Sequence, residues 1–286
     1  PMAVEDAGRK VRFTFPDPEI LSPPLLSLEN VKVGYDDKPI LTNLNLRLDQ
    51  DDRIALLGAN GEGKSTFAKL ISKQLPTMEG ELKSQSKLRI GFFAQHQIED
   101  LIPNETALEH LKPHFPNDPP SKLRSRLSTF GIDSDIVENS VETLSGGQKA
   151  RLSLMLATLH APHLLILDEP TNHLDMESRE ALIRALADYS GAVIIVSHDL
   201  HLLSLTVNKL WLVNQGKISE YPNDLSDYRD LLLKERGGEQ LKQKIVKQKK
   251  RHDSRTIKLS SLKIDILNSE KRIEKIEAML KKIDDH

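Results

Sequence analysis

One eight-residue run constrains this chain more than any other part of its sequence. Residues 58–65 read Gly-Ala-Asn-Gly-Glu-Gly-Lys-Ser and fit the pattern G-x-x-x-x-G-K-[ST], which occurs once in the chain. Residues 53–58 lead into it as a compact apolar strand, and residues 64–74 after it are typical of a helix. Because a strand, a glycine loop and a helix in this order form a phosphate-binding loop, the run predicts an α/β fold that binds a nucleotide.

The residues of this loop have separate expected roles. Glycines let backbone N–H groups turn inward around the phosphates, and the helix that follows adds the positive end of its dipole. Lys64 would place its charge on the phosphates, Ser65 would give its hydroxyl to Mg²⁺, and Thr66 would close the first helical turn. The predicted nucleotide-binding residues here are Gly58, Asn60, Gly61, Gly63, Lys64, Ser65 and Thr66.

Polar residues follow two further apolar runs. Residues 164–167 lead into Asp168 and Glu169, and residues 193–196 lead to Ser197 and His198. Short continuous apolar runs are typical of strands buried in a parallel sheet, whose carboxyl ends meet at the ligand-binding edge. Asp168 would therefore orient Mg²⁺, Glu169 would polarise the attacking water, and His198 would sense the γ-phosphate. Each could also be an ordinary loop residue, and the phosphate loop favours the catalytic interpretation.

Other segments suggest how the chain is organised. Residues 25–35 and 40–48 alternate apolar and polar side chains, which predicts half-buried antiparallel strands. Residues 104–142 are helical in pattern and interrupted by prolines, which predicts a small helical subdomain. Residues 88–94 resemble a further strand, and residues 147–160 and 177–189 resemble helices. Residues 1–24 are turn-rich, include Pro16, Pro18, Pro23 and Pro24, and are expected to be a linker.

The end of the chain differs from the body in charge and pattern. Residues 239–286 carry 14 Lys and Arg against 8 Asp and Glu, so a net charge of −2 for the chain leaves −8 on residues 1–238. Apolar residues from Leu259 to Ile283 recur at three- and four-residue steps, which predicts a coiled-coil arm, with a docked amphipathic helix as the alternative. The basic run from Lys242 to Lys258 could neutralise RNA phosphates or simply be solvated.

Bulk composition excludes some classes of protein. The chain has no cysteine, which excludes disulfides and thiolate metal sites. No apolar run approaches the roughly 18–20 residues that span a bilayer, so we expect a soluble, cytoplasmic protein without a membrane partner.

Four motifs in a fixed order resemble the nucleotide-binding domain of the ATP-binding cassette (ABC) superfamily. They are the phosphate loop, the Leu-Ser-Gly-Gly-Gln run at 144–148, the acidic strand end at 164–169 and the Ser197-His198 pair. The resemblance covers about residues 25–236 and implies ATP as the substrate and Mg²⁺ as the cofactor. It further implies that Tyr35 stacks on adenine and that Gln95 reaches the Mg²⁺ and the water. In this superfamily the Leu-Ser-Gly-Gly-Gln signature acts on the nucleotide of another cassette, a role implied here for Ser145, Gly146, Gly147 and Gln148.

Two runs resemble the ABC-F class, whose members work on ribosomes. They are Pro-Thr-Asn-His-Leu-Asp at 170–175 and Leu-Ser-Gly-Gly-Gln-Lys-Ala-Arg at 144–151. The class joins two cassettes by a helical linker, and residues 13–24 resemble the end of that linker. We therefore interpret the chain as a fragment with a linker remnant at 1–24, a second cassette at 25–236 and a coiled-coil arm at 239–286.

The resemblance implies an ATPase that needs a second cassette, supplied by the missing half of the same chain or by a second copy of the fragment. It would bind the ribosome near the tRNA exit site in its ATP-clamped state, with ribosomal RNA or tRNA as partners. The cassette of a membrane transporter and an ATP-switched scaffold or nucleic-acid-binding protein remain alternatives.

Overall fold

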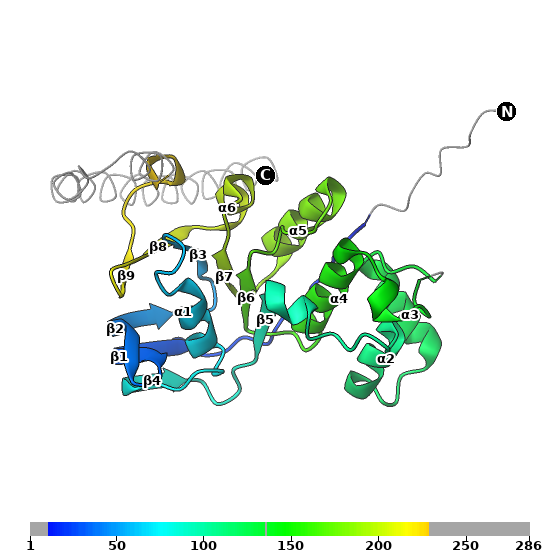
Figure 1. The fold of residues 1–286 in the computed structure, drawn as a ribbon, viewed down its shortest axis with the longest axis horizontal. Helices are drawn as coiled ribbons and strands as arrows, with labels where there is room; N and C mark the ends of the chain where they lie inside the picture. Colours follow the sequence, from blue (N-terminus) through cyan, green and yellow to red (C-terminus); the bar gives the residue numbers. More distant parts are fainter. Residues whose placement is uncertain (1–10, 135, 229–286) are drawn as a thin grey trace, which may run out of the picture. The chain divides into compact units, whose positions relative to one another are not determined.

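The structure is a computed structural model that describes residues 11–134 and 136–228. The chain divides into two compact units, Pro1–Tyr221 and Pro222–His286. The predicted coiled coil, the basic run from Lys242 to Lys258 and the predicted cassette end at 236 lie outside the described residues. In the described part of the second unit, the N–H of Tyr228 donates to the carbonyl of Asp224. All the elements named below belong to the first unit (Figure 1).

A three-stranded antiparallel sheet has the order β2-β1-β4. Its strands are β1 (Leu26–Tyr35), β2 (Lys38–Leu48) and β4 (Glu79–Ser84). The two alternating segments predicted as antiparallel strands are thus confirmed, and they pair from Leu26 opposite Leu48 to Tyr35 opposite Lys38. The sequence pattern missed β4, because its residues Glu-Gly-Glu-Leu-Lys-Ser include one apolar side chain and a glycine.

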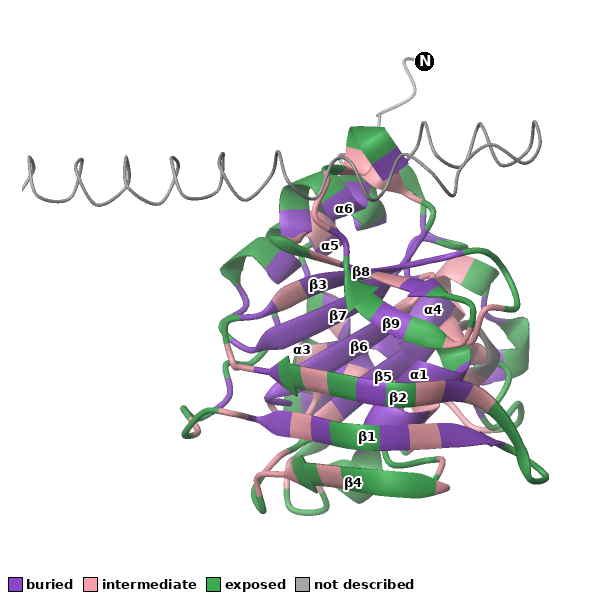
Figure 2. Ribbon diagram, turned by 90° about the vertical axis from the view of Figure 1, so that its left-hand side faces the viewer, coloured by how far each residue is buried: buried purple, intermediate pink, exposed green. Residues whose placement is uncertain are grey.

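A six-stranded sheet has the order β5-β6-β7-β3-β8-β9 and is parallel except for β9. Its strands are β3 (Arg53–Leu57), β5 (Ile90–Ala94), β6 (Leu164–Asp168), β7 (Ala192–Val196), β8 (Lys209–Asn214) and β9 (Lys217–Glu220). Figure 2 shows that β7 is buried along its whole length and that β4 of the other sheet is largely exposed. Because β5, β6, β7 and β3 run in parallel, the residues that follow them meet at one edge.

Helices complete the fold. They are α1 (Lys64–Ile71), α2 (Ala107–Leu111), α3 (Pro120–Thr129), α4 (Gly146–Thr158), α5 (Met176–Asp188) and α6 (Leu200–Thr206), with short 3₁₀ turns η1 (Gln95–Ile98), η2 (Lys112–His114) and η3 (Val141–Thr143). The helix predicted over 64–74 ends at Ile71, and Lys73 has a left-handed φ of 62°. Figure 1 shows α2 and α3 grouped beside α4, where the helical subdomain was predicted. Within the described residues, no helix combines the length and apolarity needed to cross a membrane.

Residues 11–24 form no helix or strand, yet they pack on the body of the unit. Phe13 is 4% exposed and stacks on Phe130 with ring centroids 5.2 Å apart. Phe15 is 7% exposed, and its ring lies 6.3 Å from Phe130 and 6.1 Å, edge-on, from Tyr189. Because Phe130 follows α3 and Tyr189 follows α5, this segment ties the helical subdomain to the core of the unit.

Candidate functional site

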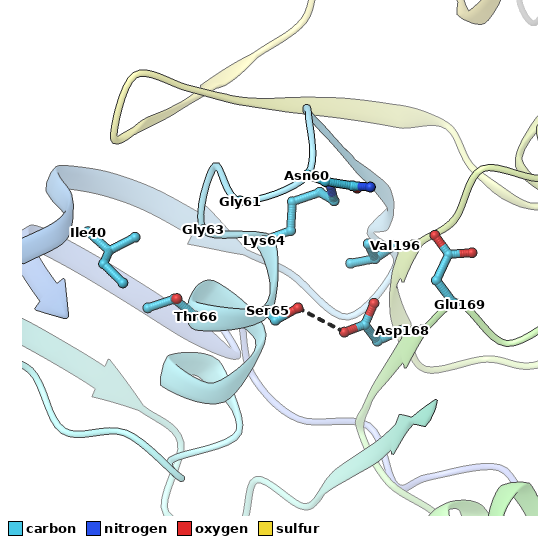
Figure 3. Close-up of a pocket in the computed structure, with 10 residues that line it drawn as sticks. All are labelled: Ile40, Asn60, Gly61, Gly63, Lys64, Ser65, Thr66, Asp168, Glu169 and Val196. Carbon is cyan, nitrogen blue, oxygen red and sulfur yellow. Dashed lines mark hydrogen bonds between the residues drawn. The ribbon is translucent and has the colours of Figure 1, made fainter. Parts of the chain in front are cut away.

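A cavity of about 330 Å³ lies between the phosphate loop and the ends of β6 and β7 (Figure 3). Its lining consists of Ile40, Asn60, Gly61, Gly63, Lys64, Ser65, Thr66, Asp168, Glu169 and Val196. All of these except Ile40 and Val196 were predicted as site residues from the sequence. The cavity therefore brings together two motifs that lie about one hundred residues apart in the chain.

The phosphate loop connects β3 to α1 and requires glycine at its last turn. Gly63 is the N-cap of α1 and has a φ of 104°, in the left-handed region that favours glycine. A Cβ at this position would lie 2.9 Å from side-chain carbons of both Ile40 and Leu41. No side chain caps α1 at Gly63, so the N–H groups of its first turn can serve a bound anion.

Lys64 is the cation of the cavity. Its Nζ donates to the carbonyl oxygens of Gly58 at 2.8 Å and Ala59 at 3.0 Å. Burial lowers the pKa of this ammonium, and the nearby carboxylates of Asp168 and Glu169 oppose that change. The charge is thus held against the loop, where phosphate oxygens can take the place of the two carbonyls.

Ser65 and Asp168 meet across the cavity. The Ser65 hydroxyl, in the first turn of α1, donates to Oδ2 of Asp168 at 3.2 Å (Figure 3). Asp168 is the last residue of β6. A hydroxyl and a carboxylate are the hard oxygen donors that Mg²⁺ prefers, and Mg²⁺ usually completes its shell with water and phosphate oxygens. The pair therefore fits the predicted Mg²⁺ ligands.

Glu169 follows β6 in a left-handed conformation with a φ of 51°. Its backbone N–H donates to the carbonyl of Val196 at 2.7 Å, which anchors it to the end of β7. Burial raises the pKa of its carboxyl group, the charge of Asp168 adds to the rise, and His198 opposes it. A carboxylate with a raised pKa is a stronger base, which suits the predicted role of Glu169 toward water.

The structure also brings His198 to Glu169. Nε2 of His198 lies 3.6 Å from Oε1 of Glu169. The His198 side chain is 61% exposed and the Glu169 side chain is 22% exposed, so the histidine is the more accessible of the two. His198 is outside the cavity lining. Its predicted contact with the γ-phosphate stays a prediction.

Two further predicted residues, Tyr35 and Gln95, are not part of the cavity lining. Tyr35 is 41% exposed at the end of β1, and Nζ of Lys69 on α1 lies 5.9 Å from the centre of its ring. Gln95 begins η1 directly after β5, whose Ala94 pairs with Asp168 on β6. The Gln95 side chain lies outside the described parts of the structure.

The four signature residues form the beginning of α4. Ser145 is the N-cap, and its hydroxyl accepts a bond from the N–H of Gln148 at 3.2 Å. The Gln148 side-chain oxygen accepts from the N–H of Ser145 at 2.8 Å, which completes a capping box. Gly146 and Gly147 occupy the first turn between them. None of these residues lines the cavity at Lys64, and their action on another cassette's nucleotide stays a prediction.

Sequence patterns missed three residues at this site. Ile40 of β2 and Val196 of β7 line the cavity, but nothing in their runs separates them from ordinary core residues. Glu62 holds the loop from outside, because its Oε2 accepts a bond from the N–H of Gln215 at 2.8 Å. Gln215 lies in the turn between β8 and β9, 153 residues away in sequence, so no local signal could have revealed this contact.

Comparisons with known proteins agree with this geometry. Residues 41–172 match the family model described as ABC transporter. The chain is 45% identical over 221 residues to the Probable ATP-binding protein YheS of Escherichia coli K12, covering 77% of the chain and 35% of that protein. It is 41% identical over 230 residues to ABC transporter F family member 3 of Arabidopsis thaliana, covering 80% of the chain and 32% of that protein. It thus spans about a third of the length of these relatives.

Solved structures share the fold. The dimeric, post-hydrolysis structure of the ATP-binding cassette MJ0796 bound to ADP and Pi matches with a TM-score of 0.59 and 23% identity, over 68% of this chain and 97% of that one. A bacterial Atm1-family ABC exporter with ATP bound matches with a TM-score of 0.60 and 20% identity, over 74% of this chain and 41% of that one. This chain therefore belongs to the ATP-binding cassette family, and its matched relatives include members of the ABC-F class.

Proposed function

We propose that this chain hydrolyses ATP as one half of a two-cassette clamp. The observation that carries the proposal is the meeting of Ser65 with Asp168 in a cavity that Lys64 and Glu169 also line. This set supplies a phosphate-binding cation, oxygen ligands and a base within one cavity. Phosphoryl transfer requires little more from a protein than such positioning and charge stabilisation.

Each residue of the site has its own role in the proposed hydrolysis of ATP. The loop N–H groups and Lys64 hold the β- and γ-phosphates of ATP, and Tyr35 stacks on the adenine. Ser65 and Asp168 would hold Mg²⁺, with Gln95 as a further ligand, and the ion when bound supplies neutralising charge to the phosphates. Glu169 accepts a proton from water as the water oxygen bonds to the γ-phosphorus and the bond from that phosphorus to the bridging oxygen breaks, leaving ADP. His198 contacts the departing phosphate.

The site needs a second cassette. The signature residues begin α4 and do not line the cavity at Lys64, and this arrangement supports a role for them at a nucleotide held elsewhere. The MJ0796 cassette has been solved as a dimer. We propose that the partner of this chain is another cassette of the same protein or a second copy, and that the single cassette hydrolyses ATP slowly.

The likeness to F-class relatives supports a role on the ribosome. We propose that the ATP-clamped protein binds the ribosome in the cytoplasm near the tRNA exit site, and that hydrolysis releases it. The basic run after Lys242 would contact RNA phosphates through counterion release, without base stacking, because it contains no aromatic residue.

Glu169→Gln in the whole protein tests both parts of the proposal. We expect unchanged ATP binding and a loss of turnover of roughly 10²–10⁴-fold, as for other general bases. The trapped variant should sediment with ribosomes in ATP, and Glu180→Gln, at an exposed carboxylate on α5, is the matched control. Retained turnover would remove Glu169 from the role of base. Sedimentation with membranes instead of ribosomes would favour a transporter cassette.

A further inference from the structure

The turn between β8 and β9 contacts the phosphate loop without lining the cavity. It consists of Gln215 and Gly216, whose φ values of 49° and 72° are both left-handed. Two consecutive left-handed residues between antiparallel strands form the type I′ turn that suits the twist of a β-hairpin. The turn pairs Asn214 with Lys217, so its backbone groups have fixed positions relative to β8.

Glu62 joins the phosphate loop to this turn. Its Oε2 accepts a bond from the backbone N–H of Gln215 at 2.8 Å. Because the donor is a backbone group, the bond does not depend on the side chain of Gln215. Glu62 lies between Gly61 and Gly63, which both line the cavity, so the bond holds the loop at its middle.

Both ends of the loop are also packed against strands. At its start, a Cβ at Gly58 would lie 2.6 Å from the carbonyl oxygen of Val213 on β8. At its end, a Cβ at Gly63 would lie 2.9 Å from Cγ2 of Ile40 on β2. Glu62 therefore adds a contact between two points where the loop backbone already lies close to the sheets.

The same turn also supports a wall of the cavity. The carbonyl of Gly216 accepts a bond from the N–H of Thr42 at 2.8 Å. A Cβ at Gly216 would lie 2.9 Å from the carbonyl oxygen of Ile40, which lines the cavity. One hairpin turn thus contacts the phosphate loop on one side and β2 on the other.

A carboxylate in a phosphate-binding loop has an electrostatic cost, because it repels the phosphates. Its charge also acts on Lys64. Burial lowers the pKa of the Lys64 ammonium, and the charges of Asp168, Glu169 and Glu62 oppose that change, with Glu62 contributing least of the three. Charge alone would therefore favour a neutral residue at position 62. A hydrogen bond to a charged acceptor is stronger than one to a neutral acceptor, so the bond to Gln215 can offset this cost.

We propose that Glu62 is a positioning residue for the phosphates of ATP, and that it holds the phosphate loop in its binding conformation through the backbone of the β8–β9 turn. This inference rests on the proposed function, in which the loop holds the β- and γ-phosphates. Glu62 does not line the cavity, so it acts through the loop rather than on the nucleotide. Its effect should appear on any ligand that carries the triphosphate, with or without adenine.

Two substitutions in the whole protein separate the bond from the charge. Glu62→Ala removes the acceptor, whereas Glu62→Gln removes the charge and keeps an oxygen that can accept the bond. Calorimetric titration with ATP and with inorganic tripolyphosphate compares a ligand that has adenine with one that lacks it. We expect Glu62→Ala to weaken both affinities by the same factor, about tenfold, because the ligand must then order the loop. Glu62→Gln should stay within about twofold of wild type.

Turnover should distinguish positioning of the phosphates from a part in the chemistry. In Glu62→Ala the KM for ATP should rise and kcat should stay within about twofold, because the loop contact serves the ground state and the transition state alike. Gln215→Asn is the matched control, since it changes the side chain of the donor residue, retains its N–H and tolerates the left-handed conformation. It should leave both affinities unchanged.

Several results would overturn the inference. Wild-type affinities in Glu62→Ala would do so, whether or not its unfolding midpoint falls, because they would make the contact purely structural. Equal weakening in Glu62→Ala and Glu62→Gln would assign the effect to charge, and tighter binding in both would show that the carboxylate only repels the ligand. Weaker binding of ATP alone would place the effect at the adenine. A wild-type protein that binds ATP without hydrolysing it would instead refute the proposed function and leave this inference standing.

Discussion

Phe15→Ala should destabilise the cassette although Phe15 lies in a segment whose sequence is typical of a linker. The side chain is 7% exposed and contacts the rings of Phe130 and Tyr189. Truncation of a buried phenylalanine costs about 3–5 kcal/mol. Because residues 11–24 form no helix or strand and can therefore adjust more easily to a smaller side chain, we expect a value near the lower end, about 3 kcal/mol.

That loss is large enough to measure by thermal unfolding. For a unit of about 200 residues, 1 kcal/mol corresponds to roughly 2–4 °C, so the midpoint should fall by about 6–12 °C. The assay is fluorescence of Trp211, the one tryptophan of the chain, which is 6% exposed on β8. Phe15→Leu keeps most of the buried area and loses the two ring contacts, and it should cost about 1–2 kcal/mol.

Ile20→Ala is the matched control, because Ile20 belongs to the same segment and is 91% exposed. It should change the free energy of unfolding by no more than about 0.5 kcal/mol. Equal midpoints for Phe15→Ala and Ile20→Ala would refute the reasoning, since they would mean that residues 11–24 contribute nothing to the folded unit.

Two further predictions concern the site. Burial raises the pKa of Glu169 above its ordinary value of 4.5, so its contribution to stability is fully present below that value and is lost as the pH rises through the folded pKa. Glu169→Gln should therefore unfold at higher urea than wild type at pH 7.5, by a margin that shrinks toward pH 5; a margin independent of pH would contradict the stated cause. Gly147→Ala should lower the unfolding midpoint more than Gly146→Ala, because its Cβ would meet the His173 carbonyl oxygen at 3.0 Å rather than a side-chain atom at 3.6 Å; equal midpoints would show that the loop yields freely.

Local patterns were sufficient for the parts of the site that a single segment builds. The phosphate loop could be predicted because its glycines, lysine and hydroxyl act within one turn, where spacing alone decides which groups converge. The buried strands ending at Asp168 and Val196 could be predicted because continuous apolar runs indicate a strand covered on both faces. The strand β4 could not be predicted, because its mostly polar residues show neither a continuous apolar run nor an alternation of apolar and polar side chains.

Contacts between distant segments were beyond the reach of any pattern. Ile40 against Gly63, Glu62 bound to Gln215, and Phe15 against Tyr189 each join residues that only the folded chain brings together. Residues 11–24 form no helix or strand, as the prolines among them indicate, but the burial of Phe13 and Phe15 depends on the residues that they contact. An amino-acid composition typical of a linker therefore does not predict whether the segment packs on the folded unit.

The sequence by itself determined which groups are available to this cassette, because the residues proposed to bind phosphate and to activate water are encoded in short runs of fixed spacing. Only the tertiary structure decided how those runs are connected. It placed Ser65 beside Asp168 and the signature at the beginning of α4, outside the lining of the cavity at Lys64. It also placed Arg151 of α4 3.6 Å from Asp175, the N-cap of α5. The reason is physical: spacing along a chain fixes which side chains are neighbours within one turn, whereas contacts across a sheet or between helices depend on how the whole core packs.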